Sequence, residues 1–327
     1  MPDDSGPPDR NDLVVPCADL DGAIAYLTGS PGFRLDMIMP ADCPRVALVS
    51  GHGIRLRLET AATLPLHDTR HGRGLLVSRS GEGGAATGRA GMRYRDLIPG
   101  RMGGRFIASH ICIPGGGPVP DYVHYHHVRF QLIYCRRGWV RVVYEDQGPA
   151  FVMQAGDCVL QPPTIRHRVL EASPGLEVIE IGGPAEHETW REHELELPTA
   201  SLRPDREFGG QRFVRHVAAG AIWIPDGESG IRCCDLGMTD ATRGLVRLRV
   251  LEASGGAATT TRQVHLGELL FLFALDGEFQ VSSATHGSTQ LVADDACVLP
   301  TGADYVLELR TGARLLELAL PAPAPAT

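Results

Sequence analysis

Short runs of β-branched and other apolar residues dominate the hydrophobic pattern of this chain, and clusters of Gly, Pro and Asp separate them. Long amphipathic helical stretches are scarce. Over residues 54–59 apolar and polar residues alternate strictly, which indicates a strand with one buried face. The 39 Gly and 24 Pro are many for a helical protein and are typical of sandwiches and barrels. The pattern therefore predicts a mainly β protein.

The first sixty residues predict a small unit of their own. Residues 1–11 are acidic and turn-prone, and we expect a disordered tail there. Asp19 or Asp21 can cap a short helix that runs to Leu27. Around that helix, apolar runs predict strands at residues 12–16, 34–39, 45–50 and 54–59. Residues 12–60 should therefore form a βαβββ module.

The rest of the chain predicts a linker and two β domains. Residues 61–100 are rich in Gly, Arg, Thr and Ser, so we expect a linker with a short helical turn at 94–97. Strands are then predicted at 106–113, 123–130, 131–135, 139–144, 151–153, 158–161, 167–171 and 176–181. A polar connection over 184–212 precedes a second strand-rich stretch. The expected domains are residues 101–200 and 201–327.

Composition limits the classes of partner. The chain has 327 residues, 43% of them hydrophobic, and a net charge of −8 with no basic stripe, which argues against nucleic acid. No apolar run reaches the roughly 18 residues of a membrane helix. Eight scattered cysteines form no CxxC pair, which favours reduced thiols and a cytoplasmic location. We expect a small-molecule substrate as the partner, with no nucleic acid and no membrane.

Three histidines are the strongest chemical signal. His124 and His126 are two residues apart, so on a strand their side chains point to the same face. His167 follows about 40 residues later, behind another turn-rich stretch. Neutral imidazole is the commonest metal ligand in proteins. The spacing therefore predicts a mononuclear metal site inside a barrel.

The spacing of this region resembles the two motifs of the cupin superfamily. The first motif reads His124, His126, Gln131 and Gly138, with Gln131 where the family has Glu. The second reads Gly156, Pro162-Pro163-Thr164 and His167, with Thr164 where the family has Gly. The resemblance covers about residues 101–325. It implies a double-stranded β-helix (jelly-roll) fold and a three-histidine centre for one divalent metal, with Fe(II) favoured and Zn(II), Mn(II) or Ni(II) as alternatives.

Neighbouring residues provide candidates for substrate contacts. Gln131 is either a ligand or, in our preferred interpretation, a residue that orients substrate or water; being neutral, it leaves the site more cationic than Glu would. Gln161 and Arg166 are expected to reach the substrate, with Arg166 in a catalytic role beside Gln131. His127 should point to the opposite face, and His110 should pack on an adjacent strand.

The last third of the chain resembles a second cupin without its metal site. When Gly277 is aligned with Gly138, the four ligand positions hold residues that cannot bind a catalytic metal together. The residues at these positions are Gln263, His265, Leu270 and Tyr305. We therefore expect a bicupin in which the second barrel buries an interface with the first.

Residues 18–27, 31–34 and 53–59 resemble one module of the vicinal oxygen chelate (glyoxalase-like) superfamily. Glu59 falls where that family often has a carboxylate ligand, but Val14 and Val15 stand where a histidine is expected. The resemblance therefore implies a structural or dimerising module without a metal. We expect the chain to form a homodimer.

The arrangement is similar to that of gentisate-type ring-cleaving bicupins, with one three-histidine barrel, no motif Glu and a degenerate second barrel. That similarity implies a non-haem dioxygenase acting on a small oxygenated, anionic or aromatic metabolite that chelates the metal. Two alternatives stay open. One is a non-oxidative metal-dependent isomerase, cyclase or lyase, and the other is a cupin protein that only binds a small molecule.

Overall fold

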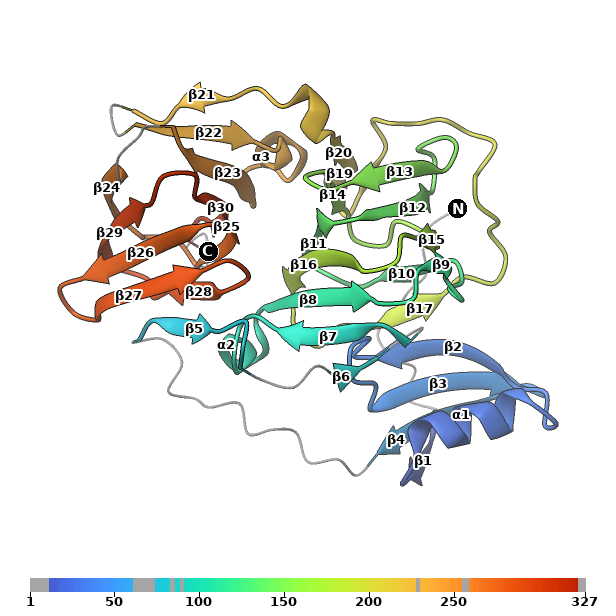
Figure 1. The fold of residues 1–327 in the computed structure, drawn as a ribbon. Helices are drawn as coiled ribbons and strands as arrows, with labels where there is room; N and C mark the ends of the chain where they lie inside the picture. Colours follow the sequence, from blue (N-terminus) through green and yellow to red (C-terminus); the bar gives the residue numbers. More distant parts are fainter. Residues whose placement is uncertain are drawn as a thin grey trace, which may run out of the picture.

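The structure is a computed structural model that describes residues 12–60, 74–82, 86–88, 91–227, 230–254 and 259–322. Figure 1 shows two β domains side by side and a smaller N-terminal unit below the first of them. The helices described are short: α1 (Leu20–Thr28), α2 (Arg101–Gly104), α3 (Met238–Ala241) and the 3-10 turn η2 (Ala218–Gly220). The predicted mainly β fold with two barrels is confirmed.

The N-terminal unit has the predicted element order. Asp19 caps α1 by accepting a hydrogen bond of 3.0 Å from the backbone N–H of Gly22. Leu20 of the helix packs in one cluster with Val49 and Leu58 of the strands, which buries the apolar face of the sheet. The strands are β1 (Leu13–Cys17), β2 (Arg34–Met39), β3 (Val46–Gly51) and β4 (Ile54–Thr60), with β1 parallel to β4 and the others antiparallel. Its relation to the glyoxalase-like proteins stays a prediction.

The sheet of this unit continues into the first barrel. Strand β2 pairs with β17, and β17 in turn pairs with β10, the strand that carries His124 and His126. The barrel strands of this sheet are β17 (Thr189–Arg191), β10 (His124–His126), β15 (His167–Ala172), β12 (Trp139–Tyr144), β13 (Phe151–Gln154) and β9 (Gly117–Pro118). The prediction of a strand over 123–130 is too long, and the polar connection predicted over 184–212 contains β17.

The facing sheet of the first barrel has seven strands. They are β20 (Val214–His216), β14 (Cys158–Gln161), β11 (Phe130–Arg137), β16 (Leu176–Gly183), β8 (Ile107–Ile113), β7 (Arg93–Asp96) and β6 (Ala86–Thr87). A small hairpin of β18 (Glu207–Phe208) and β19 (Gln211–Arg212) follows β17. Inward side chains of the two sheets enclose the space that the candidate site occupies.

The second barrel repeats this architecture. One sheet contains β21 (Ile224–Pro225), β22 (Ile231–Asp235), β23 (Arg247–Ala253), β30 (Arg314–Leu320), β25 (Leu269–Asp276), β28 (Ala296–Leu299) and β5 (Leu76–Ser78). The other contains β24 (Thr259–Val264), β29 (Asp304–Leu309), β26 (Glu278–Ser283) and β27 (Gly287–Val292). Its interior is closed by leucine, phenylalanine and other apolar side chains.

The prediction of a linker over residues 61–100 with a helical turn at 94–97 is wrong for the described part. Strand β5 joins the second barrel, and β7 lies on β8 of the first. Tyr94 is buried on β7, while Arg95 donates to the Asp294 carbonyl of the second barrel at 2.8 Å. The backbone and polar side chains of these strands bind partners that are far away in the sequence, and local periodicity cannot reveal such partners. Residues 1–11 and 61–73 lie outside the described residues.

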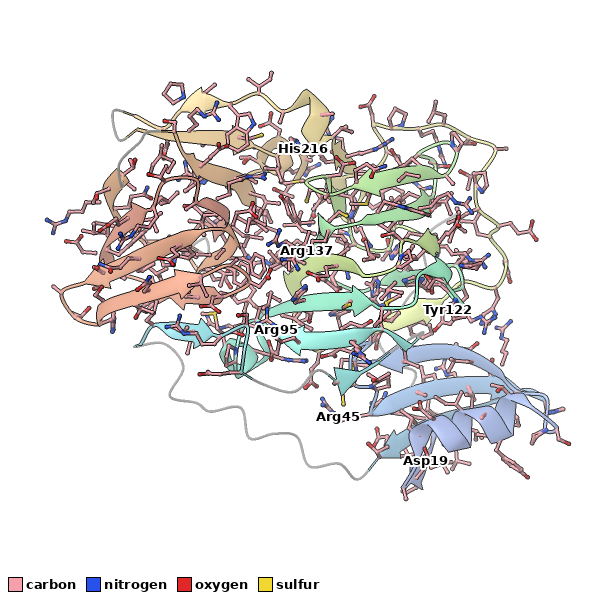
Figure 2. The ribbon with its side chains drawn as sticks, in the orientation of Figure 1. Asp19, Arg45, Arg95, Tyr122, Arg137 and His216 are labelled. Atoms are coloured by element: carbon pink, nitrogen blue, oxygen red, sulfur yellow. The ribbon has the colours of Figure 1, made fainter. Side chains whose placement is uncertain are left out.

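The two barrels share an interface, as predicted. Phe106 and Phe130 of the first barrel belong to one buried cluster with Phe271 of the second. Arg137 and Arg95 lie between the domains in Figure 2, and both reach Asp294 of the second barrel. Apolar burial and ion pairs therefore hold the barrels together. None of the helices in the described part of the chain has the length and apolar character to cross a membrane.

Candidate metal centre

The structure brings His124, His126 and His167 together inside the first barrel. The first two lie on the inward face of β10, and β15 places His167 directly opposite His124 in the strand register. One ring nitrogen from each lies within 4.8 Å of the others, and all three side chains are buried. No other group of three His, Cys, Asp or Glu side chains with this spacing is found among the described residues.

Hydrogen bonds on the outer edges of the rings fix two tautomers. His124 Nδ1 lies 2.8 Å from the Tyr122 carbonyl oxygen, and His167 Nδ1 lies 3.0 Å from that of Ile165. A carbonyl oxygen only accepts, so both Nδ1 atoms carry the proton and both Nε2 atoms keep a lone pair. His126 Nδ1 contacts the Thr189 hydroxyl at 3.0 Å. This outer set of partners orients the rings as metal sites require.

The donor set fits a divalent metal. Three neutral imidazoles can provide three nitrogen ligands and leave positions for oxygen ligands, which is the pattern of a catalytic centre. In this structure the Gln161 amide donates to His167 Nε2 at 2.9 Å. Because that bond uses the lone pair that a metal needs, a bound ion would replace it and free the Gln161 N–H toward the pocket.

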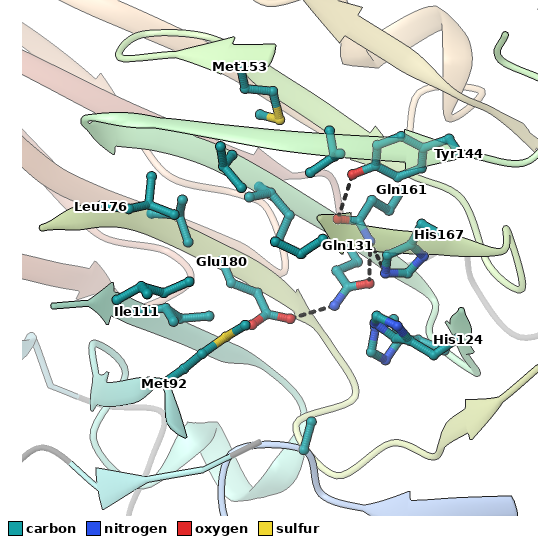
Figure 3. Close-up of a pocket in the computed structure, with 18 of the residues that line it drawn as sticks. Met92, Ile111, His124, Gln131, Tyr144, Met153, Gln161, His167, Leu176 and Glu180 are labelled. Atoms are coloured by element: carbon teal, nitrogen blue, oxygen red, sulfur yellow. Dashed lines mark hydrogen bonds between the residues drawn. The ribbon is translucent and has the colours of Figure 1, made fainter. Parts of the chain in front are cut away.

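A short polar chain lies next to the histidines (Figure 3). Gln131 donates from Nε2 to the carboxylate of Glu180 at 2.5 Å and accepts at Oε1 from Gln161 at 3.4 Å. Tyr144 in turn donates its hydroxyl to Gln161 Oε1 at 3.2 Å. Burial raises the pKa of Tyr144 far above its usual value, so the hydroxyl keeps its proton. These bonds fix which way both amides face.

The remainder of the pocket is apolar. Its walls include Met92, Ile111, Val140, Met153, Leu176 and Val178, and its volume is about 90 Å³. Since one water needs roughly 10–15 Å³ by this measure, the cavity holds only a small molecule. No Lys or Arg is among the described residues that line it, and Glu180 is its one carboxylate.

Sequence reasoning missed several pocket residues. Glu180 could have been found, because Leu176 and Val178 precede it at the two-residue period of one strand face. Ala41 comes from the loop after β2 of the N-terminal unit, and Met92 and Tyr94 come from the segment predicted as a linker. These three reach the pocket only through tertiary packing.

The other sequence candidates lie outside the pocket lining. The Arg166 guanidinium stacks 4.2 Å over the Tyr125 ring and pairs with Glu192 at 3.1 Å, so the structure does not bring the predicted catalytic arginine to the site. His127 points away and contacts Glu188 at 2.9 Å. His187, which we did not single out, lies beside His126 with a ring distance of 5.3 Å.

His110 on β8 also lies outside the three-histidine cluster. Its Nε2 contacts Glu177 at 3.0 Å, and Arg95 lies 3.3 Å from its Nδ1. Burial lowers the pKa of His110. The neighbouring Arg95 lowers this pKa further, whereas the Glu177 carboxylate raises it without offsetting the burial. This histidine therefore belongs to the interface between the barrels, on a strand next to the site, as the sequence indicated.

The second barrel has the predicted substitutions at matching places. Gln263 faces Tyr305 in the strand register, as His124 faces His167. Gly302 donates its N–H to the His265 carbonyl at 2.7 Å, and Thr164 donates to the His126 carbonyl at 3.0 Å. Leu270 lies where Gln131 lies. One histidine among these residues cannot hold a catalytic metal.

Comparisons with known proteins agree with this architecture. Residues 109–181 match the cupin domain family. The chain is similar to the solved structure of the protein Ylba from E. coli, with a TM-score of 0.56 and 10% identity, over 79% of this chain and 95% of that chain. No curated protein matches the chain.

Two enzymes with solved structures are also similar. For a mutant of oxalate decarboxylase from Bacillus subtilis the TM-score is 0.55 and the identity 13%, over 76% of this chain and 78% of that chain. For a mutant of salicylate 1,2-dioxygenase from Pseudoaminobacter salicylatoxidans the TM-score is 0.51 and the identity 15%, over 69% and 75%. At such identities the likeness shows the fold, which is that of a bicupin.

Proposed function

We propose that this protein is a metal-dependent bicupin enzyme that binds one divalent ion at His124, His126 and His167, with Fe(II) as the favoured metal and Zn(II), Mn(II) or Ni(II) as alternatives. The observation that carries the proposal is the meeting of three buried imidazoles at the head of an apolar pocket. Such neutral ligands leave the ion its full charge and open positions for oxygen donors.

We further propose that the reaction is a dioxygenation of a small oxygenated substrate. When bound, the metal would supply Lewis acidity, and iron would add redox chemistry with dioxygen. The salicylate dioxygenase among the similar structures lends support to this reaction class. The apolar walls exclude water from the reacting atoms, which protects a reactive intermediate from hydrolysis.

The chain's own residues then have separable tasks. Gln131 is held between Glu180 and Gln161, so its amide presents a fixed edge to the substrate. Gln161 would offer an N–H to substrate oxygen once the metal occupies His167 Nε2. We assign Gln131 and Gln161 to substrate positioning, while Arg166 is occupied by Glu192 and Tyr125 and keeps no catalytic role in the proposal.

A non-oxidative isomerase, cyclase or lyase is the second candidate, and one observation favours it. Glu180 places a carboxylate in the pocket, and a carboxylate near an enolisable substrate can accept a proton. In that reaction the metal would polarise the substrate without changing its oxidation state.

Metal analysis combined with oxygen consumption separates these functions. Protein loaded with Fe(II) under anaerobic conditions is mixed with candidate substrates, and oxygen uptake is followed with an electrode. Stoichiometric oxygen consumption supports the dioxygenase, whereas turnover without oxygen uptake supports the second candidate. Ligand binding without turnover would leave a binding protein and refute both enzymes.

A further inference from the structure

Tyr144 links the two sheets of the first barrel beside the three histidines. It is the last residue of β12 and faces His167 in the strand register, with the two ring centroids 5.5 Å apart. Its hydroxyl donates to Oε1 of Gln161, which lies on β14 of the facing sheet (Figure 3). Among the described residues no other group donates to this oxygen. Both side chains are buried, so solvent water has little access to the bond.

The Gln161 amide has two unlike ends, since Oε1 only accepts hydrogen bonds and Nε2 only donates them. Nε2 lies 2.9 Å from His167 Nε2 and 3.4 Å from Gln131 Oε1. Gln131 uses its own Nε2 for the bond to Glu180, so its oxygen is the end that faces Gln161. The bonds at both ends of the Gln161 amide therefore select one orientation, with the nitrogen toward the histidines.

The position of that nitrogen is one that a metal ligand could take. Ligand atoms that share an ion with bonds of about 2.1 Å lie roughly 3 Å apart, and Gln161 Nε2 lies 2.9 Å from His167 Nε2. An amide oxygen can bind a divalent ion, whereas an amide N–H cannot. Turning the Gln161 amide around would therefore change a hydrogen-bond donor into a fourth ligand without any movement of the backbone.

We infer that Tyr144 is a positioning residue that holds Gln161 in its donor orientation, so that the amide stays off the ion and offers its N–H to an oxygen of the bound ligand. The inference deepens the proposed function and rests on its metal centre. A position that Gln161 does not fill stays open to a chelating substrate, as a catalytic centre requires.

The second barrel contains the same kind of bond at a place without a histidine cluster. Tyr305 is buried and donates its hydroxyl to Gln263 Oε1 at 3.1 Å. These two residues stand at the positions of His167 and His124. A tyrosine-to-glutamine bond by itself is therefore compatible with a closed apolar barrel, and Tyr305 offers a matched control for Tyr144.

The change Tyr144→Phe keeps the ring and removes only the hydroxyl. Gln161 Oε1 then loses its one donor, and a buried acceptor without a partner is costly. A bound ion can satisfy that oxygen if the amide turns, so we expect the amide to become a ligand in this variant. The bond between Gln161 and Gln131, at 3.4 Å, is too long to prevent the turn.

The experiment uses protein loaded with Co(II), whose metal content is measured first and whose visible absorption reports the ligand set. The probe is 2-hydroxyacetophenone, a small neutral molecule that chelates through a phenol oxygen and a carbonyl oxygen. In Tyr144→Phe we expect shifted Co(II) bands before any probe is added. We also expect the probe to bind about tenfold more weakly, as calorimetry measures, because Gln161 competes for its position and no longer donates to it.

Two changes at Gln161 separate positioning from a merely structural role. Gln161→Glu has an oxygen at both ends and should shift the Co(II) bands even with Tyr144 in place. Gln161→Leu has neither a donor nor a ligand atom. Adding Tyr144→Phe to Gln161→Leu should therefore change the probe affinity by less than about twofold, since Tyr144 acts through the amide. The control Tyr305→Phe should keep the wild-type spectrum and affinity.

The inference is overturned if Tyr144→Phe or Gln161→Glu keeps the wild-type spectrum, or if Tyr144→Phe has the same effect on affinity with and without Gln161. It is also overturned if Tyr305→Phe reproduces the changes of Tyr144→Phe. The spectra without probe decide by themselves if the probe binds too weakly to measure. Failure of the proposed function gives different results. A wild-type chain that takes up no Co(II) overturns the metal centre together with the inference, whereas a loaded chain that never consumes oxygen with iron refutes only the dioxygenase.

Discussion

Arg249→Met should destabilise the second barrel strongly, because it would remove the nearest cationic partner of the buried Glu317 carboxylate. Glu317 is 1% exposed, and Arg249 holds it with bonds of 2.6 Å from Nε and 3.4 Å from Nη2. Burial alone would lower the pKa of Arg249, but the Glu317 carboxylate more than offsets this and raises it. The remaining Arg247 is half-exposed and lies 3.5 Å away. Loss of one partner of such a pair costs about 3–5 kcal/mol.

The double variant Arg249→Met/Glu317→Leu provides the internal control. Replacing both charges by apolar groups removes the desolvation cost together with the attraction, so we expect the double variant to lie within about 1 kcal/mol of the wild type. The assay is urea unfolding of the metal-free protein followed by circular dichroism, with the free energy taken from the transition of the second barrel. A cost below about 1 kcal/mol for the single variant, or a double variant as unstable as the single, would refute the reasoning.

Three further predictions follow from particular contacts. Ala41→Trp should fill the pocket from the N-terminal unit and weaken the binding of 2-hydroxyacetophenone, a small chelating ligand, to the Co(II)-loaded protein about tenfold, as calorimetry measures; unchanged affinity would remove Ala41 from the pocket. Thr164 has a φ of 66°, so Thr164→Gly should raise the unfolding free energy by up to about 1 kcal/mol in urea titrations, and a loss would show that the hydroxyl matters more. The hydrogen bond from His127 lowers the pKa of Glu188 from 4.5, so the carboxylate stabilises the fold above that pH and less as the pH falls through the lowered pKa. Glu188→Gln should therefore lower the melting temperature at pH 7, and lower it progressively less as the pH falls below 4.5; an effect of equal size at every pH would contradict this.

The three-histidine cluster is the part of the candidate site that the sequence predicted best. The i, i+2 spacing of His124 and His126 determines their common face, and the hairpin that carries His167 brings it opposite. The equivalences in the second barrel were also predictable, because they depend only on counting from Gly277. Spacing within one supersecondary unit carries this information without any knowledge of distant packing.

The chemistry of the pocket walls was less accessible. Glu177 and Glu180 lie on the same strand and look alike in sequence, and only the strand period from Leu176 separates the pocket face from the interface face. Arg166 seemed close because it precedes His167, but it lies in the turn before β15, and its guanidinium contacts Glu192 and the Tyr125 ring instead. Ala41 and Met92 reach the site from other units, which no local pattern encodes.

The measurement that tests the metal centre most directly is the metal content of protein purified without a histidine tag. Wild-type protein should contain about one divalent ion per chain. His126→Ala should lose it, and His265→Ala, which changes the matching residue of the second barrel, should retain it. A wild-type protein without metal after reconstitution, or equal metal in both variants, would contradict the three-histidine centre.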